Sequence, residues 1–221
     1  GVLTGGSSTA AIAAETAEFR PHGPFREPLR RAFRPPGRWH TIAPRIEANQ
    51  GDPMSDNAFD ILILNGRPAA GKSEVIDYLK RCPVAERIER FHIGAFHELD
   101  DFCILWERFE DDDIREKHGK PRLISDTHFT YQGERLPGYV FKDKFFWNFL
   151  IEKFNLEYEK LLRDDAGFHD VTTLFIEFAR GAEHGGFETA YDYLSAEILE
   201  RAATLYIHCS WEESLRKNRR R

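Results

Sequence analysis

One short motif, GRPAAGKS from Gly66 to Ser73, holds the residues whose types and spacing best suit chemistry. It fits the pattern G-x-x-x-x-G-K-[ST], in which a glycine-bounded loop wraps a phosphate. The two glycines have no Cβ, so successive backbone N–H groups can turn inward around an anion. A lysine then reaches the outer phosphate oxygens, and a serine hydroxyl can bind Mg²⁺. The motif predicts a nucleotide site made by Gly66, Arg67, Pro68, Ala69, Ala70, Gly71, Lys72 and Ser73.

Such a loop works only between a buried strand and the start of a helix. Residues 61–64 form a continuous apolar run that ends in the turn signal Asn65-Gly66, as expected of a strand buried on both faces. After the loop, Val75, Ile76 and Leu79 recur at helical spacing until Pro83. The flanking pattern therefore predicts strand, loop and helix, whose N-terminus adds further unpaired N–H groups.

Two carboxylates follow a second expected strand at residues 91–93. Asp100 and Asp101 come just before a helical apolar face made by Phe102, Leu105, Trp106 and Phe109. One interpretation is that they cap this helix and complement its dipole. The other places a carboxylate at the carboxyl edge of the sheet, where it accepts a proton from an acceptor hydroxyl or orients it.

A third strand is predicted at residues 171–178, with Glu177 near its end. A carboxylate there can hold Mg²⁺ opposite Ser73, whereas the simpler interpretation is a solvent-exposed strand end. Arg180 follows in a turn, where it contacts phosphate or acceptor, or forms a surface salt bridge.

A fourth strand is expected at residues 204–208, followed by a helix capped by Ser210. Arg216, Arg219 and Arg220 share one face of that helix at spacing i, i+3 and i+4. Clustered guanidinium groups can neutralise charge on a transferring phosphoryl group, or they can simply complement the helix dipole.

Between the second and third strands, residues 120–140 are rich in Pro, Gly and polar residues and predict a loop or flap, with residues 127–131 as a candidate short strand. Residues 142–163 predict a long helix with large apolar side chains at every fourth position. That stripe is expected to be core, with lining of an acceptor pocket as the alternative.

Composition narrows the classes of protein. The net charge of −6 argues against a protein built mainly to bind nucleic acid. Three cysteines without paired spacing indicate free thiols in a reducing compartment, and the histidines lack the spacing of a zinc site. No stretch approaches the 18 or more apolar residues of a membrane span, so we expect a cytoplasmic protein.

The two ends of the sequence differ from the middle. Residues 1–58 hold seven of the eleven prolines and show no apolar period, so we expect a disordered or non-native extension. The only methionine, Met54, is a candidate start, and an Arg-rich targeting peptide is the alternative. At the other end, residues 219–221 stop inside an expected helix, which suggests that a domain spanning residues 59–221 is truncated.

Together these features resemble the P-loop kinase group of small-molecule, nucleoside and nucleotide kinases, and the segment from Ser210 resembles the start of that group's Arg-bearing lid. The resemblance implies a three-layer α/β sandwich with a parallel sheet ordered 2-3-1-4-5, whose fifth strand is missing here. It also implies ATP and Mg²⁺ as donor and cofactor, and a small-molecule acceptor bound by residues 100–170. The expected catalytic residues are Lys72, Asp100, Asp101, Glu177, Arg216 and Arg220, with Arg219 helping to bind the nucleotide and with Ser73 and Glu177 holding the metal.

Two alternatives stay open at this stage. A nucleotide-dependent switch should carry D-x-x-G at a strand end and N-K-x-D for guanine; residues 164–167 match the first but follow a helix, and the second is missing. A kinase of nucleic-acid ends is disfavoured by the acidic charge. The sequence leaves the acceptor and the oligomeric state open.

Overall fold

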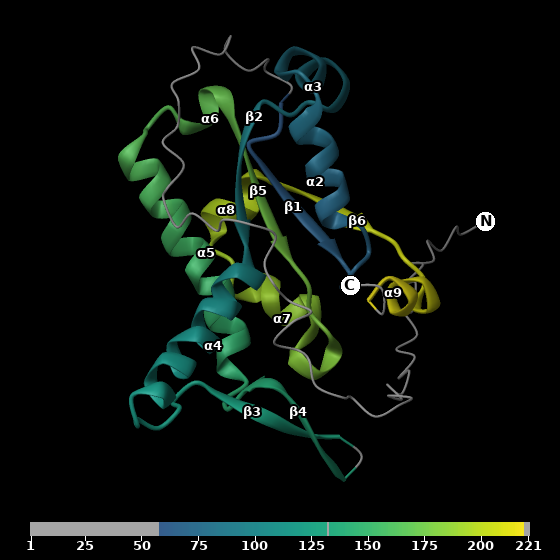
Figure 1. Ribbon diagram of the computed structural model, residues 1–221. Helices are drawn as coiled ribbons and strands as arrows, with labels where there is room; N and C mark the ends of the chain where they lie inside the picture. The colour runs from purple at the N-terminus through teal and green to yellow at the C-terminus, as the bar shows by residue number, and fades with distance from the viewer. Residues whose placement is uncertain (1–57, 132, 219–221) are drawn as a thin grey trace, which may run out of the picture. The chain divides into compact units, whose positions relative to one another are not determined.

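A computed structural model describes residues 58–131 and 133–218, and Figure 1 shows how their helices and strands are arranged. Every described residue belongs to one compact unit. Its centre is a parallel sheet with strand order β2-β5-β1-β6. The strands are β1 (Ile61–Gly66), β2 (Ala95–Asp100), β5 (Thr172–Phe178) and β6 (Ala202–Ile207). The α/β class expected from the sequence is confirmed.

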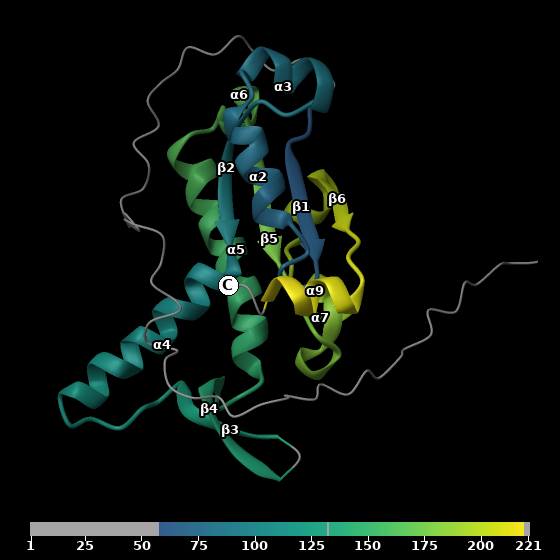
Figure 2. The same ribbon diagram turned by 45° about the vertical axis from the view of Figure 1, so that its right-hand side comes forward.

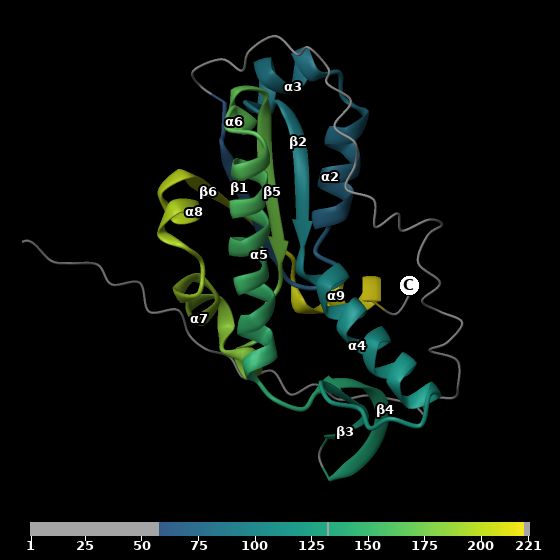
Figure 3. The same ribbon diagram turned by 90° about the vertical axis from the view of Figure 1, so that its left-hand side faces the viewer.

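Strand β1 is buried along its whole length because both faces of the sheet are covered. Ile61 and Ile63 pack into one apolar cluster, whereas Leu62 and Leu64 pack into another on the opposite face. The two layers of helices lie on opposite sides of the sheet in Figure 3. One layer is α2 (Lys72–Arg81) with α3 (Val84–Phe91), and the other is α5 (Phe145–Asp164), α6 (Phe168–Val171), α7 (Gly186–Asp192) and α8 (Ala196–Arg201). The continuous apolar pattern of β1 follows from this double coverage.

The second strand was expected at residues 91–93, and that prediction is wrong. Those residues finish helix α3 and lead out of it: His92 ends the helix with a positive φ of 58°. The strand β2 begins only at Ala95, and its register with β5 pairs Asp100 with Glu177. A segment as short as residues 91–93 fits a strand and a helix alike. Here the helix that begins after Pro83 continues as far as Phe91.

The segment expected to be a loop or flap at residues 120–140 is largely a hairpin. Strands β3 (Ser125–Tyr131) and β4 (Glu134–Phe141) pair antiparallel, beside helix α4 (Asp101–Lys117). Asp112 of α4 is fully buried and accepts hydrogen bonds from the backbone N–H groups of residues 123–125, at 2.6 to 2.9 Å. Asp112 therefore ties helix α4 to the start of the hairpin.

The aromatic stripe of α5 is core, as expected: Phe154 is fully buried and Tyr158 nearly so. The segment after Gly185 forms two helices, α7 and α8, because Ser195 caps a new helix by accepting a hydrogen bond from the Ile198 N–H. A short 3-10 turn at Ala182–His184 precedes α7. Helix α9 (Trp211–Asn218) follows β6.

Some predictions fall on residues outside the described range. These are the interpretations of residues 1–57 and the roles of Arg219 and Arg220. Among the described residues, no helix has both the length and the apolar character needed to span a membrane.

Candidate phosphate-binding site

The loop from Gly66 to Ser73 begins at one glycine and leads into α2 through another, for identifiable reasons. Gly66 closes β1, and a Cβ there would lie 2.9 Å from the backbone oxygen of Ile207 in β6, so no side chain fits. Gly71 is the N-cap of α2 with φ of 112°, a conformation that side chains disfavour. No side chain caps this helix, so its first N–H groups are left to bind something else.

The middle of the loop is a tight turn. The Ala70 N–H donates to the Arg67 oxygen at 3.0 Å, Pro68 occupies the second position, and Ala69 has φ of 58°. Proline second, a positive φ third and this hydrogen bond together define a type II turn. The third position normally prefers glycine, and here it is an alanine.

Lys72 is the first residue of α2, and only 7% of its surface is exposed. Its Nζ donates weakly to the backbone oxygens of Gly66 at 3.4 Å and Arg67 at 3.5 Å, and it lies 3.6 Å from Oε1 of Glu177. Ser73, the next residue of α2, is exposed. The ammonium group is thus held between the loop and the end of β5.

Two carboxylates share this sheet edge. Asp100 and Glu177 are paired in register at the ends of β2 and β5, and Glu177 is level with Leu64 of β1. Burial and the neighbouring charge of Asp100 raise the pKa of Glu177 to about 7, although Lys72 pulls it down. Burial also raises the pKa of Asp100. The single ammonium group of Lys72 therefore does not fully offset the charges of both Asp100 and Glu177.

This donor set suits Mg²⁺, which protein sites usually hold by one or two carboxylates, with water and substrate phosphates completing the shell. Glu177, Asp100 and the exposed hydroxyl of Ser73 are the oxygen donors at the loop. Within residues 58–131 and 133–218, no cluster of three or more His, Cys, Asp or Glu side chains could hold a metal ion unaided. A bound cation here would depend on oxygens from a ligand.

Asp100 and Asp101 are adjacent in the sequence but have different surroundings. Asp100 is the N-cap of α4 and accepts a hydrogen bond from the Phe102 N–H at 2.9 Å, so its expected capping role is confirmed. Asp101 instead forms a buried ion pair with Arg180. Burial raises the pKa of Asp101 to about 6 despite this partner. Asp100 and Asp101 both lie close enough to Lys72 and Glu177 for their charges to interact, and the charge of Asp101 is in addition paired with that of Arg180.

Arg180 is not on the surface: its side chain is 1% exposed. It donates to Asp101, to the Trp147 oxygen at 2.9 Å and to the Ala179 oxygen at 2.7 Å. Its guanidinium carbon also lies 5.3 Å from the centre of the Trp147 ring. Arg180 thus joins the start of α4, the start of α5 and the end of β5, a role that its position in the sequence did not reveal.

Helix α9 lies against the loop, as Figure 2 shows, and two contacts hold it there. The Ser214 hydroxyl donates to the Pro68 oxygen at 2.8 Å, and the Arg67 guanidinium lies 5.6 Å from the Trp211 ring centre. The helix begins as expected, with the Glu213 N–H donating to Ser210 Oγ at 3.2 Å. The segment after the fourth strand therefore reaches the glycine-bounded loop.

The basic residue of α9 nearest the loop is Lys217, which the sequence reasoning missed. Its Nζ lies 3.9 Å from the point that a Cβ on Gly71 would occupy. Arg216 instead forms a two-bond pair with Glu213, at 2.6 and 2.5 Å, on the exposed part of the helix. The spacing singled out arginines on one face, and the adjacent lysine carried no distinguishing signal.

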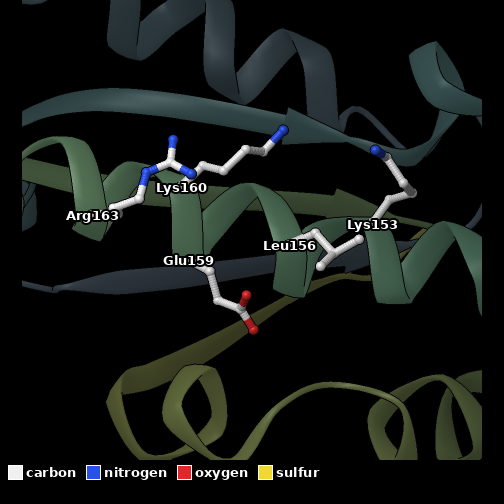
Figure 4. A pocket seen from close by; sticks show the side chains of 5 residues that line it. All are labelled: Lys153, Leu156, Glu159, Lys160 and Arg163. Atoms are coloured by element: carbon white, nitrogen blue, oxygen red, sulfur yellow. The ribbon is translucent and has the colours of Figure 1, made fainter.

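A hollow of about 540 Å³ lies elsewhere, along the exposed side of α5. Figure 4 shows its lining residues, Lys153, Leu156, Glu159, Lys160 and Arg163. Lys153 and Lys160 are both engaged with Glu157, at 3.4 and 2.6 Å. None of the predicted site residues lines this hollow.

The comparisons with known proteins gave no match: no family model, no curated protein and no solved structure matched this chain.

Proposed function

We propose that the protein is a phosphotransferase that moves the γ-phosphate of ATP to a small-molecule, nucleoside or nucleotide acceptor. The observation that carries the proposal is the meeting of Lys72 and Glu177, 3.6 Å apart, with Asp100 paired to Glu177 in the sheet. A glycine loop, an ammonium group and paired carboxylates are the parts that phosphoryl transfer needs, because its catalysis rests on positioning and charge stabilisation.

Each residue has a distinct role in this proposal. The loop N–H groups and the uncapped start of α2 bind the β-phosphate, and Lys72 neutralises the outer phosphate oxygens. Ser73 and Glu177 would hold Mg²⁺, which would offset the negative charge of the phosphates. Asp100 orients the acceptor hydroxyl or takes its proton. Asp101 contributes through Arg180 by fixing the first turn of α4.

The sheet topology supports the proposed relation to the P-loop kinase group. Counted along the chain without the β3–β4 hairpin, the strand order β2-β5-β1-β6 reads 2-3-1-4, which agrees with the first four strands of the order 2-3-1-4-5. The long segment between β2 and β5 holds α4, the hairpin and α5, and we assign acceptor binding to it. In open α/β sheets ligands bind at the carboxyl ends of the strands, where this segment starts.

Calorimetry with ATP and Mg²⁺ tests the donor half of the proposal. Lys72→Ala should weaken ATP binding by roughly tenfold to a hundredfold, the usual range for losing a hydrogen bond to a charged group. Lys80→Ala is the matched control, because Lys80 is an exposed lysine of the same helix that pairs with Glu98. Absence of ATP binding by the unaltered protein, or equal binding by both variants, refutes the proposal.

Labelled ATP with panels of nucleosides, nucleotides, small alcohols and RNA ends tests the transfer half. Label appearing on a small acceptor, and lost in Lys72→Ala, supports a small-molecule kinase. Hydrolysis without transfer points instead to a nucleotide-dependent switch, and label on RNA ends to a nucleic-acid kinase.

A further inference from the structure

The turn at the centre of the phosphate loop is in a conformation that its own sequence disfavours. Ala69 and His92 are the only non-glycine residues with positive φ among residues 58–131 and 133–218. Alanine pays a steric cost for this conformation, whereas glycine does not. The cost must therefore be offset by a contact from outside the turn.

The alternative conformation of the turn differs in one peptide group. Type I and type II turns differ mainly by a rotation of the middle peptide through about half a turn, and in type I the third residue has a negative φ that suits alanine. Here the middle peptide joins Pro68 to Ala69. The direction of the Pro68 carbonyl therefore decides which turn forms.

That carbonyl has a specific partner. Ser214 of α9 is 3% exposed, and its hydroxyl donates to the Pro68 oxygen at 2.8 Å. The Trp211 ring on the same helix lies against Arg67, the first residue of the turn. Rotation of the Pro68–Ala69 peptide would break the Ser214 hydrogen bond and leave a buried hydroxyl without its acceptor, which costs more than the bond itself contributes.

We propose that Ser214 is a positioning residue that holds the Pro68–Ala69 peptide in its type II orientation. In a trans peptide the C=O and N–H point in opposite directions, so a carbonyl directed at α9 sends the Ala69 N–H to the other side of the loop. The link to ATP binding rests on the proposed function, in which the loop N–H groups bind phosphate. In this proposal Ser214 of α9 fixes the shape of the loop but does not itself contact the nucleotide.

Three variants test the idea by calorimetry with ATP and Mg²⁺. Ser214→Ala should weaken ATP binding between about twofold and tenfold, as the loss of one hydrogen bond lowers the population of the competent turn. Adding Ala69→Gly to Ser214→Ala should recover most of this loss, because glycine accepts a positive φ without help. Ser210→Ala, which removes a hydroxyl that caps the same helix, should change the affinity less than twofold.

The outcomes separate this inference from the proposed function. Unchanged affinity in Ser214→Ala, no recovery with Ala69→Gly, or an equal loss in Ser210→Ala overturns the positioning role. If the unaltered protein does not bind ATP, the proposed function fails, and crystal structures then decide the inference. A negative φ at Ala69 in Ser214→Ala, with a positive φ in the unaltered protein, supports it, and a positive φ in both overturns it.

Discussion

Replacing Glu177 with glutamine should stabilise the folded protein at pH 8 and change it little near pH 4.5. Burial and Asp100 raise the pKa of Glu177 from 4.5 to about 7 in the folded state. The folded state therefore holds this proton more tightly than the unfolded chain does, and between pH 4.5 and pH 7 the carboxylate's contribution to stability falls as the pH rises. Glutamine mimics the protonated form and does not ionise.

The size of the effect follows from the pKa difference. A shift from 4.5 to about 7 is about 2.5 pKa units, and each unit corresponds to about 1.4 kcal/mol. The full value of about 3.5 kcal/mol is an upper figure, because the Glu177 side chain is 15% exposed and solvent screens its charge. We expect Glu177→Gln to raise the free energy of unfolding at pH 8 by about 1 to 3 kcal/mol.

Urea unfolding followed by tryptophan fluorescence, from pH 4.5 to pH 8 without Mg²⁺ or nucleotide, measures this difference. Glu98→Gln is the control, because Glu98 lies on the neighbouring strand, pairs with Lys80 and is 33% exposed. The reasoning is refuted if the stability difference between Glu177→Gln and the unaltered protein is the same at every pH. It is also refuted if Glu98→Gln removes as much of the pH dependence.

Two further predictions concern charged groups around the site. Asp101→Asn should lower the free energy of unfolding by about 3 to 5 kcal/mol, because it leaves Arg180 buried without its carboxylate. The double variant Asp101→Leu/Arg180→Met should lose less stability, because it removes both charges. Urea unfolding that shows an equal or greater loss in the double variant contradicts this prediction. Lys217→Ala should weaken ATP binding about fivefold in low salt. Arg216→Ala should weaken it less, because two hydrogen bonds to Glu213, at 2.6 and 2.5 Å, hold that guanidinium, whereas Nζ of Lys217 lies 4.0 Å from Oε1 of Glu213. Calorimetry compares the two variants, and a larger effect of Arg216→Ala would contradict the assignment.

Much of the fold could be predicted from local patterns. The apolar run of β1, the glycine loop and the amphipathic α2 follow one another directly in the sequence, so periodicity and turn chemistry were sufficient to identify them. The third and fourth strands were found for the same reason. The second strand was misplaced because the short apolar run at residues 91–93 fits a helix as well as a strand, and only the pairing of β2 with β5 shows where the strand begins.

The candidate site likewise contains some residues that the local sequence identified and others that only tertiary contacts brought together. By itself the sequence identified the loop from Gly66 to Ser73 and placed Glu177 near the end of a strand, and it left Asp100 open between a helix cap and the carboxyl edge of the sheet. Only the structure shows that β2 ends at Asp100, in register with Glu177. Only the tertiary structure decided that Asp101 pairs with Arg180, 79 residues away, and that Ser214 reaches Pro68 across 146 residues. Lys217 lies near the loop, rather than Arg216, for the same reason. Such contacts depend on how helices pack against the sheet, and that packing is set by the whole core rather than by any local pattern.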